Sequence, residues 1–455
     1  MPGNLTLDAL KSAAQDGTID TVVVAMVDMQ GRLLGKRFHV SNFLETAYEE
    51  THCCNYLLAT DFEMATPDGY ASTSWSSGYG DYIMKPDMST LRITPWAEGT
   101  AMVLCDVLDH HTHAAVPHSP RAVLKRQIER LAELGLSCTA ATELEFFVYR
   151  ETYEEARDKH YRNLTPISAY NEDYHILQTA REEGFMRPLR NQLYAAGVPV
   201  ECTKGEAEAG QAELNIRYSD ALDMADVHSL AKHATKEIAW NTGHSVSFVA
   251  KPHENLVGSS SHIHQSLRSA DGKPAFFDAS EAHGMSTVMQ QYLAGLLAHA
   301  GETTVFLAPY INSYKRFAKG TFAPTRIIWS IDNRTAGFRI VAPDSENVRV
   351  ECRIGGSDMN PYLAMASQIA AGIAGIENAM SLPAEFRGDA YEDSGTAEIP
   401  GNLRDAMAAL DGSAMLRAAM GDEVVDHYVR AARWEQEEFD RIVTDYEIQR
   451  GFERS

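Results

Sequence analysis

Two glutamates stand two residues apart at positions 142–148, in a segment with the strand-like sequence TELEFFV. Side chains alternate along a β-strand, so Glu143 and Glu145 share one face while Leu144 and Phe146 share the other. Neighbouring carboxylates repel each other unless a cation lies between them or water covers them. Taken alone, this pair fits either a cation site or an exposed sheet face.

Three further segments carry clustered polar side chains: an acidic loop at 205–213 (GEAEAGQAE), a strand with two histidines at 258–264 (GSSSHIH), and a strand with alternating charges at 349–353 (RVECR). The residues concerned are Glu206, Glu208, Glu213, His262, His264, Arg349, Glu351 and Arg353. Each segment alone could be a solvated loop, a polar histidine pair or an ion-pair ladder. Together, five glutamates and a histidine on strands with apolar back faces suit hard divalent cations.

Arginines supply the complementary charge. Five lie within residues 312–353, and the arginine fork matches phosphate and carboxylate oxygens. They are Arg316, Arg334, Arg339, Arg349 and Arg353. A metal site combined with arginine clamps indicates phosphoryl transfer from a nucleotide. The sequence has neither a Walker-type loop nor G-x-G-x-x-G, so strands would have to build the nucleotide site.

Composition narrows the class of protein. The chain has 455 residues with 63 acidic and 40 basic side chains, a net charge of −23, and 44% hydrophobic residues. These values predict a globular protein of two or three domains and exclude disorder, collagen-like repeats and coiled coil. The acidic excess argues against nucleic acid or a membrane surface as a partner. Scattered cysteines, an N-terminus unlike a signal peptide and the lack of a long apolar run predict a cytoplasmic location.

The elements that would position these residues can be read from local patterns. A β-hairpin is expected over 19–29 and 32–40, and a long polar and aromatic loop over 63–87. A boundary falls near residue 113, after which Ser119 and Pro120 start a helix that ends at Gly135. Further strands are expected at 138–149, 211–218 and 326–353, and a strand–loop–strand unit at about 245–268. A polar tract is expected at 150–190, and helices at 224–240, 285–300 and the C-terminal tail.

The motifs, taken in order, resemble those of the glutamine synthetase family in its bacterial type I-like branch. The matching segments are VVVAMVDMQGRLLGKR, GYGDYIMKPD, TELEF, KGEAEAGQAEL, GSSSHIHQSL, NSYKR, DNRTAGFR, VECRIGGSDMNPYLAMA and WEQEEFDRIVTDYE. The resemblance implies an α+β protein, with an N-terminal β-grasp domain at 1–112 and a catalytic domain at 113–455. It also implies a homo-oligomer, typically a dodecamer of two hexameric rings, with sites between subunits.

The resemblance also assigns site residues. Two or more Mg²⁺ or Mn²⁺ ions per subunit would be bound, one by Glu145, Glu206 and Glu213, the other by Glu143, His262 and Glu351. ATP would contact Tyr218, His264, Ser266, Arg334, Arg339 and Arg349. L-Glutamate would be held by Gly258, Arg316 and Arg353. The implied reaction forms γ-glutamyl phosphate from glutamate and ATP, after which an amine displaces phosphate.

Departures from the family pattern concern the acceptor. Phe322 stands where ammonium-using members carry a glutamate, and phenylalanine cannot take up a proton or form an ion pair. Val257 replaces an asparagine, and Lys204-Gly205 replaces two histidines, so the glycine is expected to leave space for a longer amine. Such replacements resemble the γ-glutamylpolyamine and γ-glutamylethanolamide synthetases.

The hypothesis is therefore ATP-dependent ligation of the glutamate γ-carboxyl to a primary amine, either a polyamine or a small alkylamine. The amine arrives as an ammonium ion at neutral pH, so a carboxylate must bind it and accept a proton. Asp68, Glu206 and Glu208, together with Phe322, are the predicted acceptor site, with Asp68 and Arg334 as catalytic residues. The alternatives are a glutamine synthetase that uses ammonia and a non-catalytic structural relative.

Overall fold

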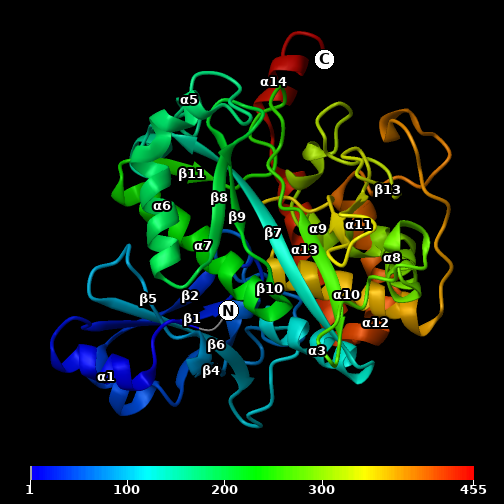
Figure 1. Cartoon of the computed structure of the whole chain (residues 1–455). Coiled ribbons are helices and arrows are strands. Elements are labelled where there is room, and N and C mark those ends of the chain that lie inside the picture. Colours follow the sequence, from blue (N-terminus) through cyan, green and yellow to red (C-terminus); the bar gives the residue numbers. More distant parts are fainter. Residues whose placement is uncertain (1–2) are drawn as a thin grey trace.

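Two β-sheets with surrounding helices make up the computed structural model, which describes residues 3–455 (Figure 1). A six-stranded sheet is formed by residues 21–109 and a nine-stranded sheet by residues 136–352. The predicted α+β class is confirmed. The predicted boundary between residues 112 and 113 falls in the segment that joins the last strand of the first sheet to the next helix.

The first sheet begins with the predicted hairpin, which is confirmed. β1 (Thr21–Val27) and β2 (Leu33–His39) are antiparallel. The turn between them is closed by Asp28 Oδ1, which accepts hydrogen bonds from the backbone N–H groups of Gln30 and Arg32. The sheet order is β2-β1-β6-β4-β3, with β5 paired to β6. The other bounds are β3 (Thr51–Cys54), β4 (Asp81–Pro86), β5 (Arg92–Ile93) and β6 (Thr100–Asp109).

The second sheet is organised around one long strand. β7 (Leu136–Tyr149) pairs with β9, β10, β11 and β12, and the main order is β13-β14-β15-β12-β7-β9-β8. Its length lets one strand carry both Glu143 and Glu145, which pair with β9 on one side and donate backbone hydrogen bonds to the carbonyls of His262 and Ser260 on the other. The other bounds are β8 (Val200–Gly205), β9 (Gln211–Ile216), β10 (Ser219–Asp220), β11 (Ser245–Ser247), β12 (Ile263–Ser269), β13 (Trp329–Ile331), β14 (Phe338–Val341) and β15 (Arg349–Cys352).

Helices enclose both sheets. α3 (Pro120–Glu133) begins at the predicted proline, and α7 (Ala221–Asn241), α8 (Thr287–Ala298) and α13 (Asp422–Arg441) match predicted helices. The remaining bounds are α1 (Leu7–Gln15), α2 (Val40–Asn42), α4 (Tyr153–Asp158), α5 (Ile176–Thr179), α6 (Glu183–Ala195), α9 (Ala300–Leu307), α10 (Pro361–Glu377), α11 (Leu403–Asp411), α12 (Ala414–Met420) and α14 (Asp445–Gly451). No helix among residues 3–455 is both long and apolar enough to span a bilayer.

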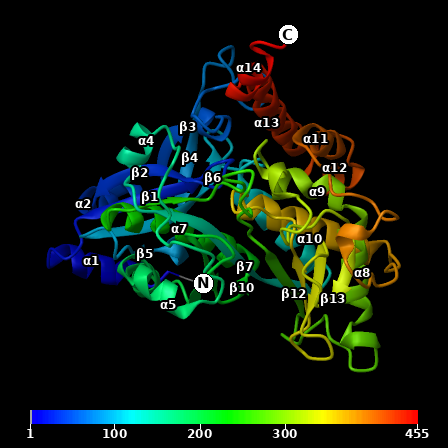
Figure 2. The same cartoon turned by 90° about the horizontal axis from the view of Figure 1, so that it is seen from above.

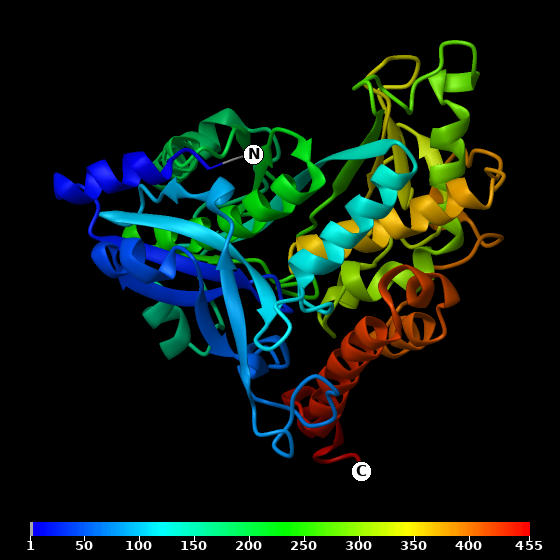
Figure 3. The same cartoon turned by 90° about the horizontal axis from the view of Figure 1, so that it is seen from below.

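Polar contacts join the first sheet to the rest of the chain. Arg121 of α3 binds Asp87 and Asp106 from the first sheet region and Asp226 of α7, and all three contacts are 2.6–3.0 Å long. Asn360 Nδ2 donates to the backbone carbonyl of Met29 at 3.0 Å. The loop that follows β3 lies beside α13 at the C-terminal end of the chain (Figures 2 and 3). Segments distant in sequence are thereby fixed together around the second sheet.

Candidate active site

Three buried or half-buried carboxylates meet where β7, β8 and β9 run side by side. Glu145 on β7 lies directly opposite Glu213 on β9, and Glu206 follows the end of β8. One oxygen from each carboxylate lies within 4.8 Å of the others. Glu145 is positioned by Ser260, whose backbone N–H and hydroxyl donate to its two oxygens at 2.6 and 2.7 Å.

These three carboxylates destabilise one another's charged form. Burial, and then the charge on Glu206, raises the pKa of Glu145 to about 8, against the hydrogen bonds from Ser260. Burial and the charge on Glu213 raise the pKa of Glu206 to about 7, although Lys204 opposes the shift. Burial and the charges on Glu143 and Glu145 raise the pKa of Glu213 to about 7. A divalent cation between these oxygens would relieve that repulsion.

A second cluster lies on the neighbouring strands β7, β12 and β15. Glu143, His264 and Glu351 bring ligand atoms within 4.8 Å of one another. The predicted ligand His262 also reaches this cluster, because its Nδ1 lies 2.7 Å from Glu143 Oε2 and 3.3 Å from Glu351 Oε1. Burial lowers the pKa of His262, as does the charge on Arg353, so the neutral imidazole is favoured. His264, predicted to contact ATP, also reaches this cluster, because its Nε2 lies 3.0 Å from Glu143 Oε1.

The donor set of both clusters fits Mg²⁺ or Mn²⁺. The first cluster offers only carboxylate oxygens, and the second offers carboxylate oxygens with one or two imidazoles. Neither cluster contains a thiol, which is the pattern that these hard cations prefer. His262 Nε2 is buried without a hydrogen-bond partner among the described residues, while its Nδ1 faces the Glu143 and Glu351 carboxylates. The six predicted metal ligands are thus brought together as two adjacent groups.

Predicted substrate-binding arginines surround the second cluster. Arg339 Nη1 donates to Glu351 Oε2 at 2.9 Å, and Arg353 Nη1 pairs with Glu351 Oε1. Arg349 Nε lies 3.4 Å from His264 Nδ1. Because burial raises the pKa of Glu351 but its interactions with the His262 ring and the Arg353 guanidinium outweigh it, the net pKa of Glu351 lies below its usual range. This carboxylate stays an anion able to bind a metal.

Arg334 and Arg316 differ in their surroundings. Arg334 is exposed, and its backbone carbonyl accepts a hydrogen bond from Arg353 Nε at 3.2 Å. Arg316 is only 2% exposed, and its Nη2 donates to the backbone carbonyl of Ile354. Its Nε is buried without a partner among the described residues. A Cβ at Gly258 would overlap the Arg316 side chain, so the glycine permits this close approach.

The loop that carries Phe322 lies over these arginines. The carbonyl oxygen of Phe322 accepts from Arg353 Nη2 at 3.4 Å, and the next residue, Ala323, accepts from the hydroxyl of Tyr391 at 3.0 Å. The side chain of Phe322 is 60% exposed, and its φ of 57° is unusual for a bulky residue. The phenylalanine ring is therefore presented to solvent beside the predicted glutamate site.

The expectation of free space at Gly205 was wrong. A Cβ at this position would lie 2.6 Å from Glu172 Cγ and 2.7 Å from the Glu172 carbonyl oxygen, so the site is filled. The filling residue comes from the 150–190 segment, which lies between β7 and β8 in the chain and for which the sequence predicts only a polar tract. Glu172 is distant from Gly205 in sequence, so the sequence pattern could not predict this contact.

Lys204 is a residue whose position sequence reasoning did not anticipate. Its ammonium group contacts Glu206 Oε1, lies 3.6 Å from Asp173 Oδ1, and lies 4.6 Å from the ring centre of Tyr174. Burial lowers the pKa of Lys204, but the charges on Glu213 and Glu206 outweigh it and raise it, so this lysine is a cation beside the first cluster. The indication in the sequence was that Lys204 replaces a histidine of the family pattern.

The other predicted site residues lie at differing places. Asp68 is held against α13, because its carbonyl accepts from Arg430 Nε at 2.7 Å. Glu208 is tied to the turn before Gly258, since its Oε1 accepts from the Val257 N–H at 2.9 Å. Tyr218 is 52% exposed, and Ser266 lies on β12 opposite Thr139. Asp68 therefore lies against α13, whereas the other predicted acceptor residues lie beside the first cluster or the predicted glutamate site.

Comparisons with known proteins agree with this geometry. Residues 117–451 match the family described as glutamine synthetase, catalytic domain. A γ-glutamylethanolamide synthetase, GlnA4, of Streptomyces coelicolor is 48% identical over 99% of this chain and 96% of its own. A glutamate–isopropylamine ligase of a Pseudomonas species is 35% identical, covering 95% of both chains. The solved structure of ligand-free GmaS has a TM-score of 0.85 and 25% identity, covering 98% of this chain and 99% of that one.

Proposed function

This chain belongs to the glutamine synthetase family, and we propose that it is an ATP-dependent ligase that joins the γ-carboxyl of L-glutamate to a small primary amine. The relatives named for ethanolamide and isopropylamine chemistry support an organic amine as acceptor. The observation that carries the proposal is the pair of carboxylate clusters on β7 combined with Phe322 on the covering loop. The carboxylate clusters can hold the metal ions that phosphoryl transfer requires. Phe322 stands in place of the carboxylate that would bind an ammonium ion.

The predicted ligands would hold two metal ions, Mg²⁺ or Mn²⁺. These ions would neutralise the charge on the ATP phosphates. We assign Glu145, Glu206 and Glu213 to one ion, and Glu143, His262 and Glu351 to the other, with His264 near the second. Ser260 fixes the orientation of Glu145 through two hydrogen bonds, so the ligand oxygens keep their positions before any ion arrives.

The arginines would orient the two reacting groups. Arg353 and Arg316, with Gly258, would hold glutamate so that its γ-carboxylate faces the γ-phosphate of ATP. The γ-carboxylate oxygen attacks phosphorus, ADP leaves, and an acyl phosphate forms. Exposed Arg334, with Arg339 and Arg349, would stabilise the charge on the transferring phosphoryl group, because the guanidinium forks match its oxygens.

The amine then attacks the acyl carbon and phosphate leaves. An alkylammonium ion, with a pKa of about 10.4, must lose a proton before it can act as nucleophile. Glu206 lies at the first cluster and would take part in binding the cation, and Asp68, supplied from a neighbouring subunit, would accept the proton. The phenyl ring of Phe322, exposed beside Arg353, would contact the alkyl part of the acceptor.

Phosphate release with ATP, Mg²⁺ and glutamate tests this function when the acceptor is varied among ethanolamine, isopropylamine, putrescine, spermine and NH₄⁺. We expect turnover with a small monoamine to exceed that with NH₄⁺ at equal concentration. Preference for NH₄⁺ would identify an ordinary glutamine synthetase. Absence of phosphate release with every acceptor would identify a non-catalytic relative.

A further inference from the structure

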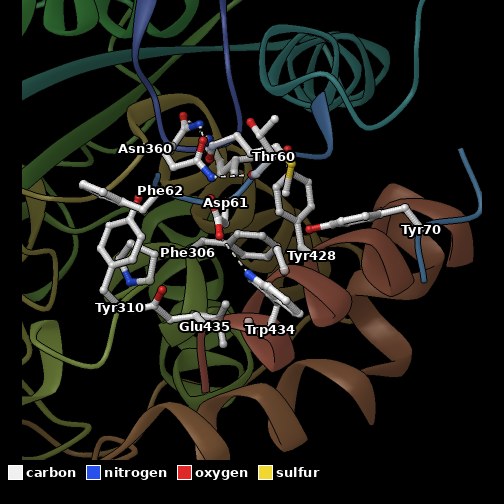
Figure 4. Close-up of a pocket in the computed structure, with 17 residues that line it drawn as sticks. Thr60, Asp61, Phe62, Tyr70, Phe306, Tyr310, Asn360, Tyr428, Trp434 and Glu435 are labelled. Atoms are coloured by element: carbon white, nitrogen blue, oxygen red, sulfur yellow. Dashed lines mark hydrogen bonds between the residues drawn. The ribbon is translucent and has the colours of Figure 1, made fainter. Parts of the chain in front are cut away.

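A cavity separate from the two carboxylate clusters lies between the loop after β3, the segment after α9 and helix α13 (Figure 4). It has a volume of about 70 Å³. A single water needs roughly 10–15 Å³ by this measure, so a molecule of about five non-hydrogen atoms fits. The lining residues that bear on its chemistry are Asp61, Phe62, Tyr70, Tyr310, Trp434 and Glu435.

The aromatic side chains present faces and edges to the cavity. The rings of Phe62 and Tyr310 meet edge to face, with centres 4.9 Å apart. Trp434 is fixed by its indole N–H, which donates to Asp61 Oδ2 at 2.9 Å. Phe62 is 53% exposed and lies at the rim, which gives small molecules a route in from solvent. Arg32 lies over the Phe62 ring and Arg430 over the Trp434 ring, each 5.4 Å from the ring centre, so the rings offer the cavity apolar surface that can pack against an alkyl group.

Within the described part of the chain, the carboxylates at the cavity are not held in ion pairs, although the Arg32 guanidinium lies nearby and donates to the Phe62 carbonyl oxygen at 2.7 Å. Asp61 Oδ1 accepts from the N–H groups of Glu63 and Ala65 at 2.9 and 2.8 Å, and Oδ2 accepts from Trp434. All three donors are neutral. Within residues 3–455, neither Asp61 nor Glu435 forms a salt bridge; the nearby Arg32 pairs with Asp28 instead. Burial raises the pKa of Glu435, as do the charges on Asp61 and Glu63, against a hydrogen bond from Ile311.

Tyr70 adds a hydroxyl group to the wall of the cavity. Its side chain is only 6% exposed, and its hydroxyl has no hydrogen-bond partner among the described residues. Figure 4 shows this hydroxyl directed toward the group of side chains around the cavity. This hydroxyl is therefore available to form a hydrogen bond with a ligand or with water in the cavity.

We propose that this cavity is a binding site for a small alkylammonium ion, with Glu435 and Asp61 facing the ammonium group, the aromatic rings around the alkyl part, and Tyr70 as hydrogen-bond partner. The site shares no residue with the metal clusters or the predicted substrate arginines. The inference therefore stands apart from the proposed ligase activity, and the cavity is a second amine site on the same chain.

Calorimetric titration of the intact full-length protein with ethylammonium chloride, without Mg²⁺, ATP or glutamate, tests the site. Ethanol, a neutral molecule of similar size, is the control ligand. We expect saturable binding of ethylammonium but not of ethanol. Glu435→Gln keeps the side-chain size and should weaken binding about tenfold or more. Glu437→Gln, on the same helix but paired with Arg430, should bind like the wild type.

Two further variants separate this site from the others. Glu206→Gln alters the first metal cluster, so ethylammonium binding that persists in it belongs to the cavity. Tyr70→Phe removes only the hydroxyl and should weaken binding even if Glu435→Gln fails to fold. The proposal is overturned if the wild type does not bind ethylammonium, if ethanol binds equally well, if both cavity variants bind like the wild type, or if Glu206→Gln abolishes binding.

Discussion

Glu145 and Glu213 lie directly opposite each other on adjacent antiparallel strands, with both side chains buried. Like charges opposite one another destabilise a sheet, so this pair opposes folding unless a cation is present. Glu213→Gln should therefore reduce phosphate release by about 100-fold or more, because a metal ligand is lost. In metal-free buffer the same change should leave the free energy of unfolding unchanged or raise it by up to about 1 kcal/mol.

Thermal unfolding in EDTA and phosphate-release assays measure the two effects. Glu129→Gln, an exposed glutamate on α3, is the control and should change neither quantity. A Glu213→Gln protein that is less stable without metal would mean that Glu213 has a structural role.

Lys204 supplies an internal cation to the same cluster. Lys204→Met should lower the melting temperature in EDTA, since Glu206 loses its ion pair. It should also reduce the Mg²⁺ concentration for half-maximal thermal stabilisation about threefold or more, because a positive charge no longer repels the ion. Lys273→Met, at an exposed pair with Asp271, is the matched control. An unchanged Mg²⁺ response would show that Lys204 does not act on the cluster.

The acceptor preference can be tested at Phe322. Phe322→Glu places a carboxylate on the loop beside Arg353, where it could bind an ammonium ion. The ratio of kcat/KM for NH₄⁺ to that for ethanolamine should rise about tenfold or more. Phe322→Leu, which keeps an apolar side chain, should leave this ratio near the wild-type value. Equal ratios in both variants would exclude Phe322 as a determinant of acceptor choice.

The parts of the fold that sequence could predict are those with local periodicity. Alternation along β7 placed Glu143 and Glu145 on one face, and the β-branched run and its turn residues predicted the first hairpin. Helix α10 was missed because it is buried on nearly all sides and so has no amphipathic period. The filling of Gly205 by Glu172 and the contact of Lys204 with Asp173 depend on a segment folded back from elsewhere in the chain.

The placement of Asp68 against α13 leads to a prediction about assembly. If Asp68 acts in the site of a neighbouring subunit, Asp68→Asn and Arg334→Ala should each lose about 100-fold or more of their activity as homo-oligomers. Mixed oligomers, made by joint refolding or co-expression, should regain part of the wild-type activity because some sites receive both intact residues. Light scattering establishes the oligomeric state. Mixed oligomers as inactive as their parents would refute the shared site.

The contacts of Arg121 predict a pH-dependent contribution to stability. Arg121→Met leaves Asp226, which is 3% exposed, without its ion pair to Arg121, although the Tyr362 hydroxyl still donates to it, and should cost about 3–5 kcal/mol of unfolding free energy at pH 7. Burial raises the pKa of Asp87, but hydrogen bonds from Ser89 and Arg121 outweigh it and lower the net value. A lowered folded-state pKa stabilises the protein above the unfolded value of about 3.9, and this contribution disappears as pH falls through the folded pKa.

The difference in melting temperature between wild type and Arg121→Met should therefore shrink as pH is lowered below about 4. Arg162→Met, at a largely exposed pair with Asp445, should cost less than about 1 kcal/mol at every pH. Scanning calorimetry from pH 3 to pH 7 measures both differences. A constant deficit in Arg121→Met across this range would show that Arg121 stabilises the fold by packing rather than through its carboxylate partners.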